Sequence, residues 1–123
     1  MMPLRRGGFD GGQIAVDGRG RFAALRRSRR RGRSGPVGVH YEPALPADLS
    51  RRVAYSVPRR VGKATERNRC RRQLREAARE VVPQVPPGDY LIGVEPGVRN
   101  VSFQELRKRV TEAMQRASGA AAR

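Results

Sequence analysis

Arginines crowd one stretch of the chain, from Arg59 to Arg79, which holds nine basic residues and two acidic ones. On a helix of about 3.6 residues per turn, Arg67, Arg71 and Arg75 fall in one row. Like charges at this spacing repel by roughly a few tenths of a kcal/mol per pair, unless phosphates neutralise them. Asn68 carries both a donor and an acceptor, which suits a base edge, a ribose hydroxyl or a backbone contact. The chemistry that these residues offer is binding to nucleic acid.

The whole chain shares this excess of positive charge. Its 123 residues contain 27 Lys and Arg against 11 Asp and Glu, which gives a formal net charge of +16. All of the basic residues except Lys63 and Lys108 are arginine, whose planar guanidinium binds phosphate through two hydrogen bonds. A charge of this size predicts a polyanionic partner.

The residues of protein-based catalysis are missing from the sequence. Cys70 is the only cysteine and His40 the only histidine, which excludes Cys-based zinc sites and makes a Ser-His-Asp triad a poor candidate. The sequence has no phosphate-binding glycine loop, nucleophile elbow or suggestive carboxylate pair. We therefore expect no catalytic residue and no metal site in the protein. No apolar run reaches the roughly 20 residues of a membrane span, and the basic start of the chain lacks the apolar stretch of a signal peptide. The sequence therefore predicts a soluble cytoplasmic protein without membrane contact.

Alternating apolar residues predict three strands that pair into one sheet. They cover residues 36–41, 52–57 and 89–94. His40 and Tyr41 are neighbours on the first strand, so one is expected to face the core and only the other to reach a ligand. The remaining tyrosines are expected to pack in the core or the sheet.

Helical periodicity predicts the elements on either side of these strands. Residues 62–82 carry an apolar stripe that includes the single cysteine, Cys70, as a small core residue. Ser102, with Glu105 three residues later, predicts a capping box that opens a last helix. Phe22 and Leu25 lie three residues apart, so a short first helix places both on one face.

Together these elements predict a single small α+β domain over residues 19–117, in the order α-β-β(-β)-α-β-α, with helices packed on the sheet. Residues 1–18 are expected to form a flexible Gly-rich basic arm, and residues 118–123 a frayed tail. The Arg-rich run over 26–33 is expected to be a loop, either solvated or covered by an anion.

The sequence between Lys63 and Ala77 resembles the signature of a known family. Its pattern Lys63-Ala64-x-x-Arg67-Asn68-Arg69-x-Arg71-Arg72-x-Leu74-Arg75-Glu76-Ala77 is similar to the Arg-Asn-Arg motif of the protein subunit of bacterial ribonuclease P. The predicted strands on either side resemble those of the family, and Phe22 stands where the family has an aromatic residue. The resemblance covers about residues 20–115.

The resemblance implies a function that the residues alone do not show. In that family the RNA subunit is the catalyst, and it removes the 5′ leader from precursor tRNA with bound magnesium. This chain would be the accessory subunit of that endoribonuclease, with ribonuclease P RNA and precursor tRNA as its partners and no protein partner. Mg²⁺ would be held mainly by RNA. The family fold also implies a left-handed β-α-β crossover, against the right-handed rule.

The resemblance also implies two groups of contact residues. The RNA subunit would be bound by Arg59, Arg60, Lys63, Arg67, Asn68, Arg69, Arg71, Arg72 and Arg75. The leader would be bound in a cleft between the first helix and the sheet, by Phe22, Arg26, Val39, His40 and Tyr41. Stacking of a base on an aromatic side chain contributes about 1–3 kcal/mol. The chain departs from the family pattern at Arg26, where a second aromatic is expected, and at Glu95, where a basic residue usually ends the strand.

Two other functions fit parts of the sequence. A small ribosomal protein would have the same charge and loose termini. A DNA-binding regulator would need a helix-turn-helix, whereas the segment from Pro83 to Gly88 leads from the basic helix into a strand.

Overall fold

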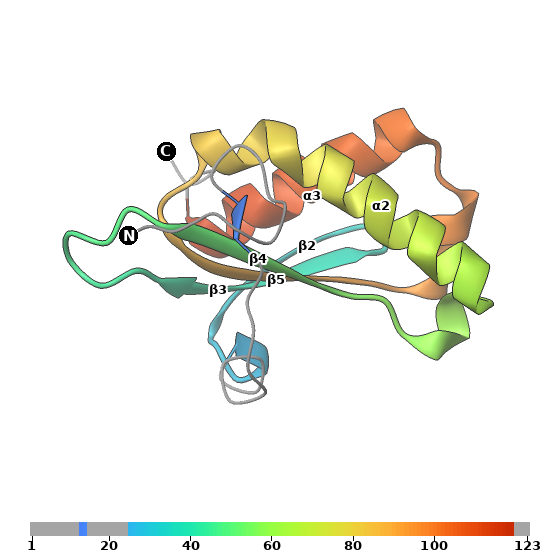
Figure 1. The fold of residues 1–123 in the computed structure, drawn as a ribbon, viewed down its shortest axis with the longest axis horizontal. Coiled ribbons are helices and arrows are strands. Elements are labelled where there is room, and N and C mark those ends of the chain that lie inside the picture. Colours follow the sequence, from blue (N-terminus) through green and yellow to red (C-terminus); the bar gives the residue numbers. More distant parts are fainter. Residues whose placement is uncertain (1–12, 15–24, 120–123) are drawn as a thin grey trace.

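The computed structural model describes residues 13–14 and 25–119. Five strands form one sheet in the order β1-β4-β5-β3-β2, and helices α2 and α3 cover one of its faces (Figure 1). The strands are β1 (Gln13–Ile14), β2 (Arg30–Ser34), β3 (Val37–Pro43), β4 (Arg51–Ser56) and β5 (Gly88–Val94). The helices are α2 (Ala64–Val81) and α3 (Phe103–Ser118), and the 3-10 turns are η1 (Arg59–Val61), η2 (Val82–Gln84) and η3 (Pro96–Asn100). The predicted α+β class is confirmed.

The three strands and two long helices expected from periodicity are all present, with ends that shift by a few residues. Two parts of the prediction fall largely outside the described residues. Of the arm over 1–18, only Gln13 and Ile14 are described, and they pair in parallel with β4. Of the first helix, Leu25 and Arg26 are described and are helical, whereas Phe22 lies outside the described residues.

Strand β2 corrects the expectation of a loop over residues 26–33. Residues Arg30–Ser34 pair antiparallel with β3, and the hairpin turns at Gly35, whose φ of 57° favours glycine. Gly32 lies directly beneath α3, where a Cβ would come within 2.3 Å of the Ala113 carbonyl oxygen. Periodicity missed this strand because its covered positions are Gly32 and Ser34 rather than apolar residues.

The core lies between the sheet and the two helices. It takes Cys70, Leu74 and Val81 from α2 and matching apolar residues from α3, all of them buried. Tyr90 of β5 is fully buried at its centre, and its ring packs on Tyr41 with centroids 4.7 Å apart. The predicted core role of Tyr90 and Cys70 is therefore confirmed.

Both helices begin with a carboxylate or hydroxyl that binds a free backbone N–H group. The Ser102 hydroxyl accepts a hydrogen bond of 3.1 Å from the Glu105 N–H, as predicted. The Glu105 carboxylate does not return to Ser102 but pairs with Arg109 at 2.7 Å, so only half of the capping box forms. At the start of α2, the Glu66 carboxylate accepts from the Lys63 N–H at 2.8 Å.

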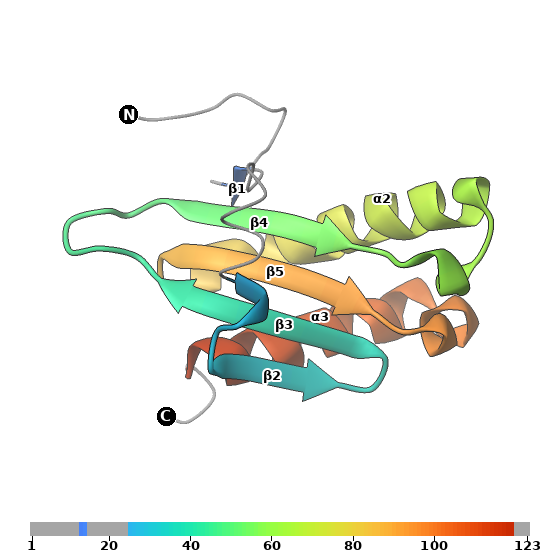
Figure 2. The same ribbon diagram turned by 90° about the horizontal axis from the view of Figure 1, so that it is seen from below.

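The connection from β4 through α2 to β5 is left-handed. These two strands are parallel neighbours in the sheet. Figure 2 shows them from the face opposite the helices, with β4 above β5, both pointing to the right, and α2 behind them. With the strands turned to point upward, the chain therefore passes behind the sheet from left to right, which is the left-handed sense. The implied crossover is confirmed.

The sheet face opposite α2 and α3 carries a smaller apolar group. Leu25 lies on this face and packs with Ala54 of β4 and Leu91 of β5. The strand register places Ala54, Leu91, His40 and Arg31 in one row across four strands. We call this side the open face. It faces downward in Figure 1 and toward the viewer in Figure 2.

Candidate nucleic-acid interface

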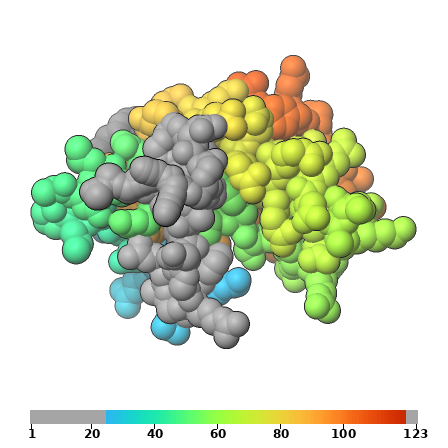
Figure 3. Space-filling model, viewed as in Figure 1, coloured from blue at the N-terminus to red at the C-terminus, as the bar shows by residue number. Residues whose placement is uncertain are grey.

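Two of the three acidic residues of helix α2 pair with arginines outside the helix, and the third, Glu76, pairs with Arg79 of the same helix at 3.5 Å. On the flank toward α3 and η3, Glu66 pairs with Arg99 at 2.8 Å and Glu80 pairs with Arg107. The arginines of the Arg-Asn-Arg segment have no carboxylate within 4 Å among the described residues. Figure 3 shows the side chains of α2 spread over one side of the molecule. The acids of this helix are thus neutralised from within the protein, whereas Arg67, Arg69 and Arg72 are open to an external anion.

The Arg-Asn-Arg segment itself is mostly exposed. Arg67 is half-buried because its Nε donates to the Gly62 carbonyl at 3.3 Å. The Asn68 side-chain oxygen accepts from the Arg71 guanidinium at 3.1 Å, which leaves the Asn68 amide NH₂ directed at solvent. Arg69 and Arg72 are exposed. The segment therefore offers guanidinium groups for phosphates and one amide donor for a base or ribose.

The other predicted RNA-subunit contacts lie along the same helix or just before it. Arg75 is half-buried, with its guanidinium carbon 6.0 Å from the centroid of the Tyr55 ring, and burial raises the pKa of Tyr55. Arg59 and Lys63 are exposed at the helix entrance. Arg60 points elsewhere, since its guanidinium pairs with Glu95 at 3.1 Å. Eight of the nine candidates thus lie on α2 or at its entrance, and Arg60 pairs away from them. They do not share one face of the helix, since Arg69 lies in a groove with Glu66 and Arg99 on the side toward η3.

The open face holds a hollow of about 420 Å³ beside the row that contains His40. Its floor is low because Gly38 of β3 and Gly93 of β5 are cross-strand partners and carry no side chains. Arg26, Arg33, His40, Arg60 and Glu95 are among the residues that surround it. The hollow is therefore an open, mainly cationic depression of the sheet.

Two arginines at the hollow share one carboxylate. Glu95 pairs with Arg60 at 3.1 Å and with Arg33 at 3.8 Å. All three side chains are well exposed, so each ion pair contributes only about 0–1 kcal/mol and exchanges readily. Glu95 stands at the position where the resemblance implies a basic residue. Its carboxylate therefore lowers the net positive charge of the hollow.

The surroundings of His40 lower its pKa. Burial and the charges of Arg31 and Arg26 lower the pKa of His40 below the usual 6.5, while the Leu25 backbone opposes this effect. Its Nδ1 is buried and makes no hydrogen bond within the described residues. A nearby anion would reverse the effect of the two arginines and favour the protonated ring.

The structure separates the three leader candidates of β3. Val39 and Tyr41 are buried in the core beneath the helices, and the Tyr41 hydroxyl donates to the Pro87 carbonyl at 2.8 Å. His40 faces the opposite way, into the hollow with Arg26. This corrects the expectation that all three residues line one cleft, because successive strand residues point to opposite faces. Phe22 lies outside the described residues.

The described residues contain no cluster of three or more His, Cys, Asp or Glu that would hold a metal ion. Among the described helices, none is long and apolar enough to span a membrane.

A family model described as Ribonuclease P matches residues 13–118. The chain belongs to the ribonuclease P protein family. The ribonuclease P protein component of Roseiflexus sp. (strain RS-1) is 38% identical over 95 residues, which are 74% of this chain and 77% of that protein. The resemblance of the Arg-Asn-Arg segment is thereby confirmed. As a ribonuclease P protein component, the chain is part of an endoribonuclease that processes tRNA.

Solved structures of ribonuclease P proteins share this fold. The RNase P protein from Thermotoga maritima superposes with a TM-score of 0.72 at 21% identity, over 83% of this chain and 96% of that one. The Staphylococcus aureus RNase P protein also gives 0.72, at 13% identity, over 85% of this chain and 93% of that one.

Sequence reasoning named Glu95 only as a departure from the family pattern, and it missed the glycine floor of the hollow. A glycine in each of two adjacent strands, Gly38 and Gly93, was the available signal, because strand glycines often mark a close approach by a ligand or another backbone. The sequence could not show that these two glycines are cross-strand partners, since the register of β3 and β5 depends on the tertiary fold.

Proposed function

We propose that this chain binds the catalytic RNA of ribonuclease P through α2 and the 5′ leader of precursor tRNA on the open face. The observation that supports this most is the division of charge: unpaired arginines on the outer flank of α2, and a separate hollow on the opposite side of the sheet. In this arrangement the protein contacts two RNA segments at once. It supplies position and charge, and the RNA supplies the catalysis.

On the α2 side, Arg69 and Arg72 would bind phosphates of the folded RNA subunit, with Lys63 and Arg59 beside them. Asn68 would use its amide NH₂ on a base edge or a 2′-hydroxyl. These contacts release counterions from the RNA, so binding should weaken steeply as salt increases.

On the open face, the hollow over Gly38 and Gly93 would take one leader nucleotide. The glycine floor leaves room for a flat base, and Arg26 and His40 lie where they can meet its phosphates. A base on this face would also stack on Phe22 if that aromatic serves as it does in the family.

Magnesium would be held mainly by RNA phosphates. The carboxylates at the open face support this, because Glu95 and Asp89 are each paired with arginine rather than gathered into an anionic site. The protein would assist by screening phosphate repulsion with its arginines. We propose no catalytic residue in the chain, and we place it in a cytoplasmic ribonucleoprotein without a second protein partner.

The test is the affinity of the assembled ribonucleoprotein for precursor tRNA and for mature tRNA. Addition of the protein to the RNA subunit should tighten binding of the precursor and leave binding of mature tRNA nearly unchanged. Equal tightening of both would show that the open face does not bind the leader. No binding of the protein to the RNA subunit would contradict the role of α2.

A further inference from the structure

A second group of arginines lies at the far edge of the sheet from α2. It consists of Arg27, Arg29, Arg30, Arg31 and Arg116, which we call the β2-edge arginines. All five are exposed, and none has a carboxylate within 4 Å among the described residues. The nearest acid on α3, Glu112, is occupied by Ser34 at 2.6 Å and by Arg109 at 3.9 Å.

This group is held in place by the fold. Ser28, in the middle of the run, is buried, and its hydroxyl donates to the Tyr41 carbonyl. Its backbone N–H closes a turn with the Leu25 carbonyl at 3.1 Å. The side chains of Arg27 and Arg29 therefore project from an anchored turn.

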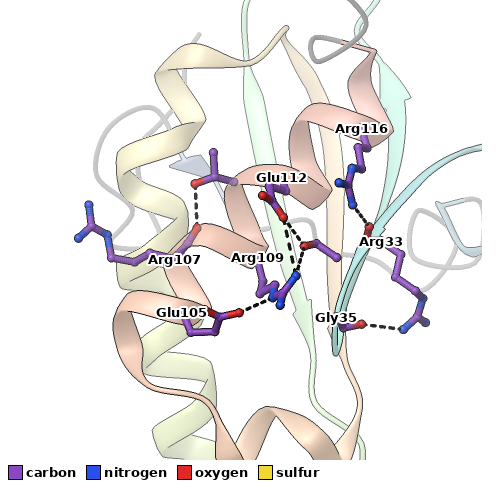
Figure 4. A network of polar contacts seen from close by, with 9 residues as sticks. Arg33, Gly35, Glu105, Arg107, Arg109, Glu112 and Arg116 are labelled. Carbon is purple, nitrogen blue, oxygen red and sulfur yellow. Dashed lines mark hydrogen bonds and ion pairs between the residues drawn. The ribbon is translucent and has the colours of Figure 1, made fainter.

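Arg116 extends the group from the sheet to α3. Its guanidinium donates to the Arg33 carbonyl at 2.6 Å, which covers a backbone acceptor on the outer edge of β2 (Figure 4). Since β2 is the last strand of the sheet, an arginine here blocks pairing with another strand. The edge thus presents cations, which suit a phosphate backbone better than an added peptide strand.

The β2-edge arginines are continuous with the hollow. Arg31 is the cross-strand partner of His40, and Arg26 connects the hollow to the turn that carries Arg27 and Arg29. A single strand that leaves the hollow toward β2 therefore passes Arg31 and the turn that carries Arg27 and Arg29. It reaches Arg30, which is on the helix side with its partner Tyr41, and Arg116 of α3 only at the sheet edge. Helix α2 lies on the other face of the sheet (Figure 2). This route favours the leader over the RNA subunit as the source of the phosphates.

We propose that the β2-edge arginines bind the phosphate backbone of the leader upstream of the nucleotide in the hollow. This inference rests on the proposed binding of the leader to the open face. It predicts that affinity for precursor tRNA continues to rise as the leader is lengthened beyond the nucleotides that fill the hollow.

The experiment compares Arg27→Gln/Arg29→Gln with Arg99→Gln/Arg107→Gln, a control that removes the same charge from arginines with carboxylate partners. Each protein is assembled with the RNA subunit, and affinity is measured for precursors whose leaders are lengthened one nucleotide at a time. The first variant should follow the wild type for short leaders and lose the further gain for long ones. Its salt dependence for long leaders should fall by about 0.7 per lost phosphate contact.

Three results would overturn the proposal or its basis. Identical leader-length profiles for the two variants would show that the edge does not bind the leader. An equal loss of affinity for mature tRNA, or for the RNA subunit, would show that these arginines serve the RNA subunit instead. A wild-type complex that ignores the leader at every length would refute the proposed function itself, which distinguishes the two failures.

Discussion

Replacing Arg69 and Arg72 with glutamine should weaken binding of the RNA subunit without unfolding the protein. Both side chains are exposed and lie off the apolar stripe of α2, so the core is untouched. Loss of two phosphate contacts lowers the slope of log affinity against log salt by about 1.4 to 1.8. When the variant and the wild type are taken to bind equally at about 1 M salt, this difference in slope makes the variant about 14- to 30-fold weaker at about 0.15 M salt. That corresponds to about 1.6–2 kcal/mol of binding free energy.

The measurement is a salt titration of fluorescence anisotropy with labelled RNA subunit. Arg99→Gln/Arg107→Gln is the control, because it removes the same charge from arginines that pair with Glu66 and Glu80. A slope that falls equally in both variants would refute the reasoning. It would mean that total charge, rather than the exposed flank of α2, determines affinity.

The remaining predictions concern the sheet and the hollow. Gly32→Ala should destabilise the fold by about 1–3 kcal/mol or more in urea unfolding, because the new Cβ would lie 2.3 Å from a backbone oxygen of α3. Gly38→Ala should leave the free energy of unfolding nearly unchanged, since its Cβ would lie 3.6 Å from the nearest atom, but it should weaken leader binding by filling the hollow. Equal destabilisation of the fold by Gly32→Ala and Gly38→Ala would contradict this difference. The lowered pKa of His40 means that the unfolded chain takes up the proton first, so stability should fall as the pH drops below 6.5, and His40→Gln should remove that component. A variant with an unchanged pH profile would exclude this role for His40. Glu95→Gln should raise leader affinity because two arginines lose their shared partner, and a decrease would show that Glu95 itself contacts the leader.

Much of the fold follows from the sequence because its signals are local. The stripe through Cys70 and Leu74 predicts α2 without knowledge of what lies beneath it, and Ser102 marks the start of α3. Strand β2 could not be predicted in this way, because the two positions that α3 covers are Gly32 and Ser34. Both are small and allow α3 to approach closely, but neither is hydrophobic. The handedness of the crossover likewise came from the family resemblance and not from any local pattern.

The candidate site likewise has one part that the sequence predicts and one part that depends on the tertiary fold. The Arg-Asn-Arg segment is contiguous, so its place on a predicted helix was sufficient to bring its side chains close together without knowledge of the tertiary fold. The hollow assembles Arg33, His40 and Glu95 from three separate segments, and its floor depends on the register of two strands. Alternation alone left open whether His40 or Tyr41 faces outward, and the packing of Tyr41 on Tyr90 decides it.

The most direct test of the central claim is cleavage of precursor tRNA by the RNA subunit, with and without this protein, across a magnesium titration. If the protein holds both the RNA subunit and the leader, it should increase the cleavage rate at low magnesium, and the increase should shrink as magnesium takes over charge screening. Absence of stimulation at every magnesium concentration, with protein shown to be folded, would contradict the claim.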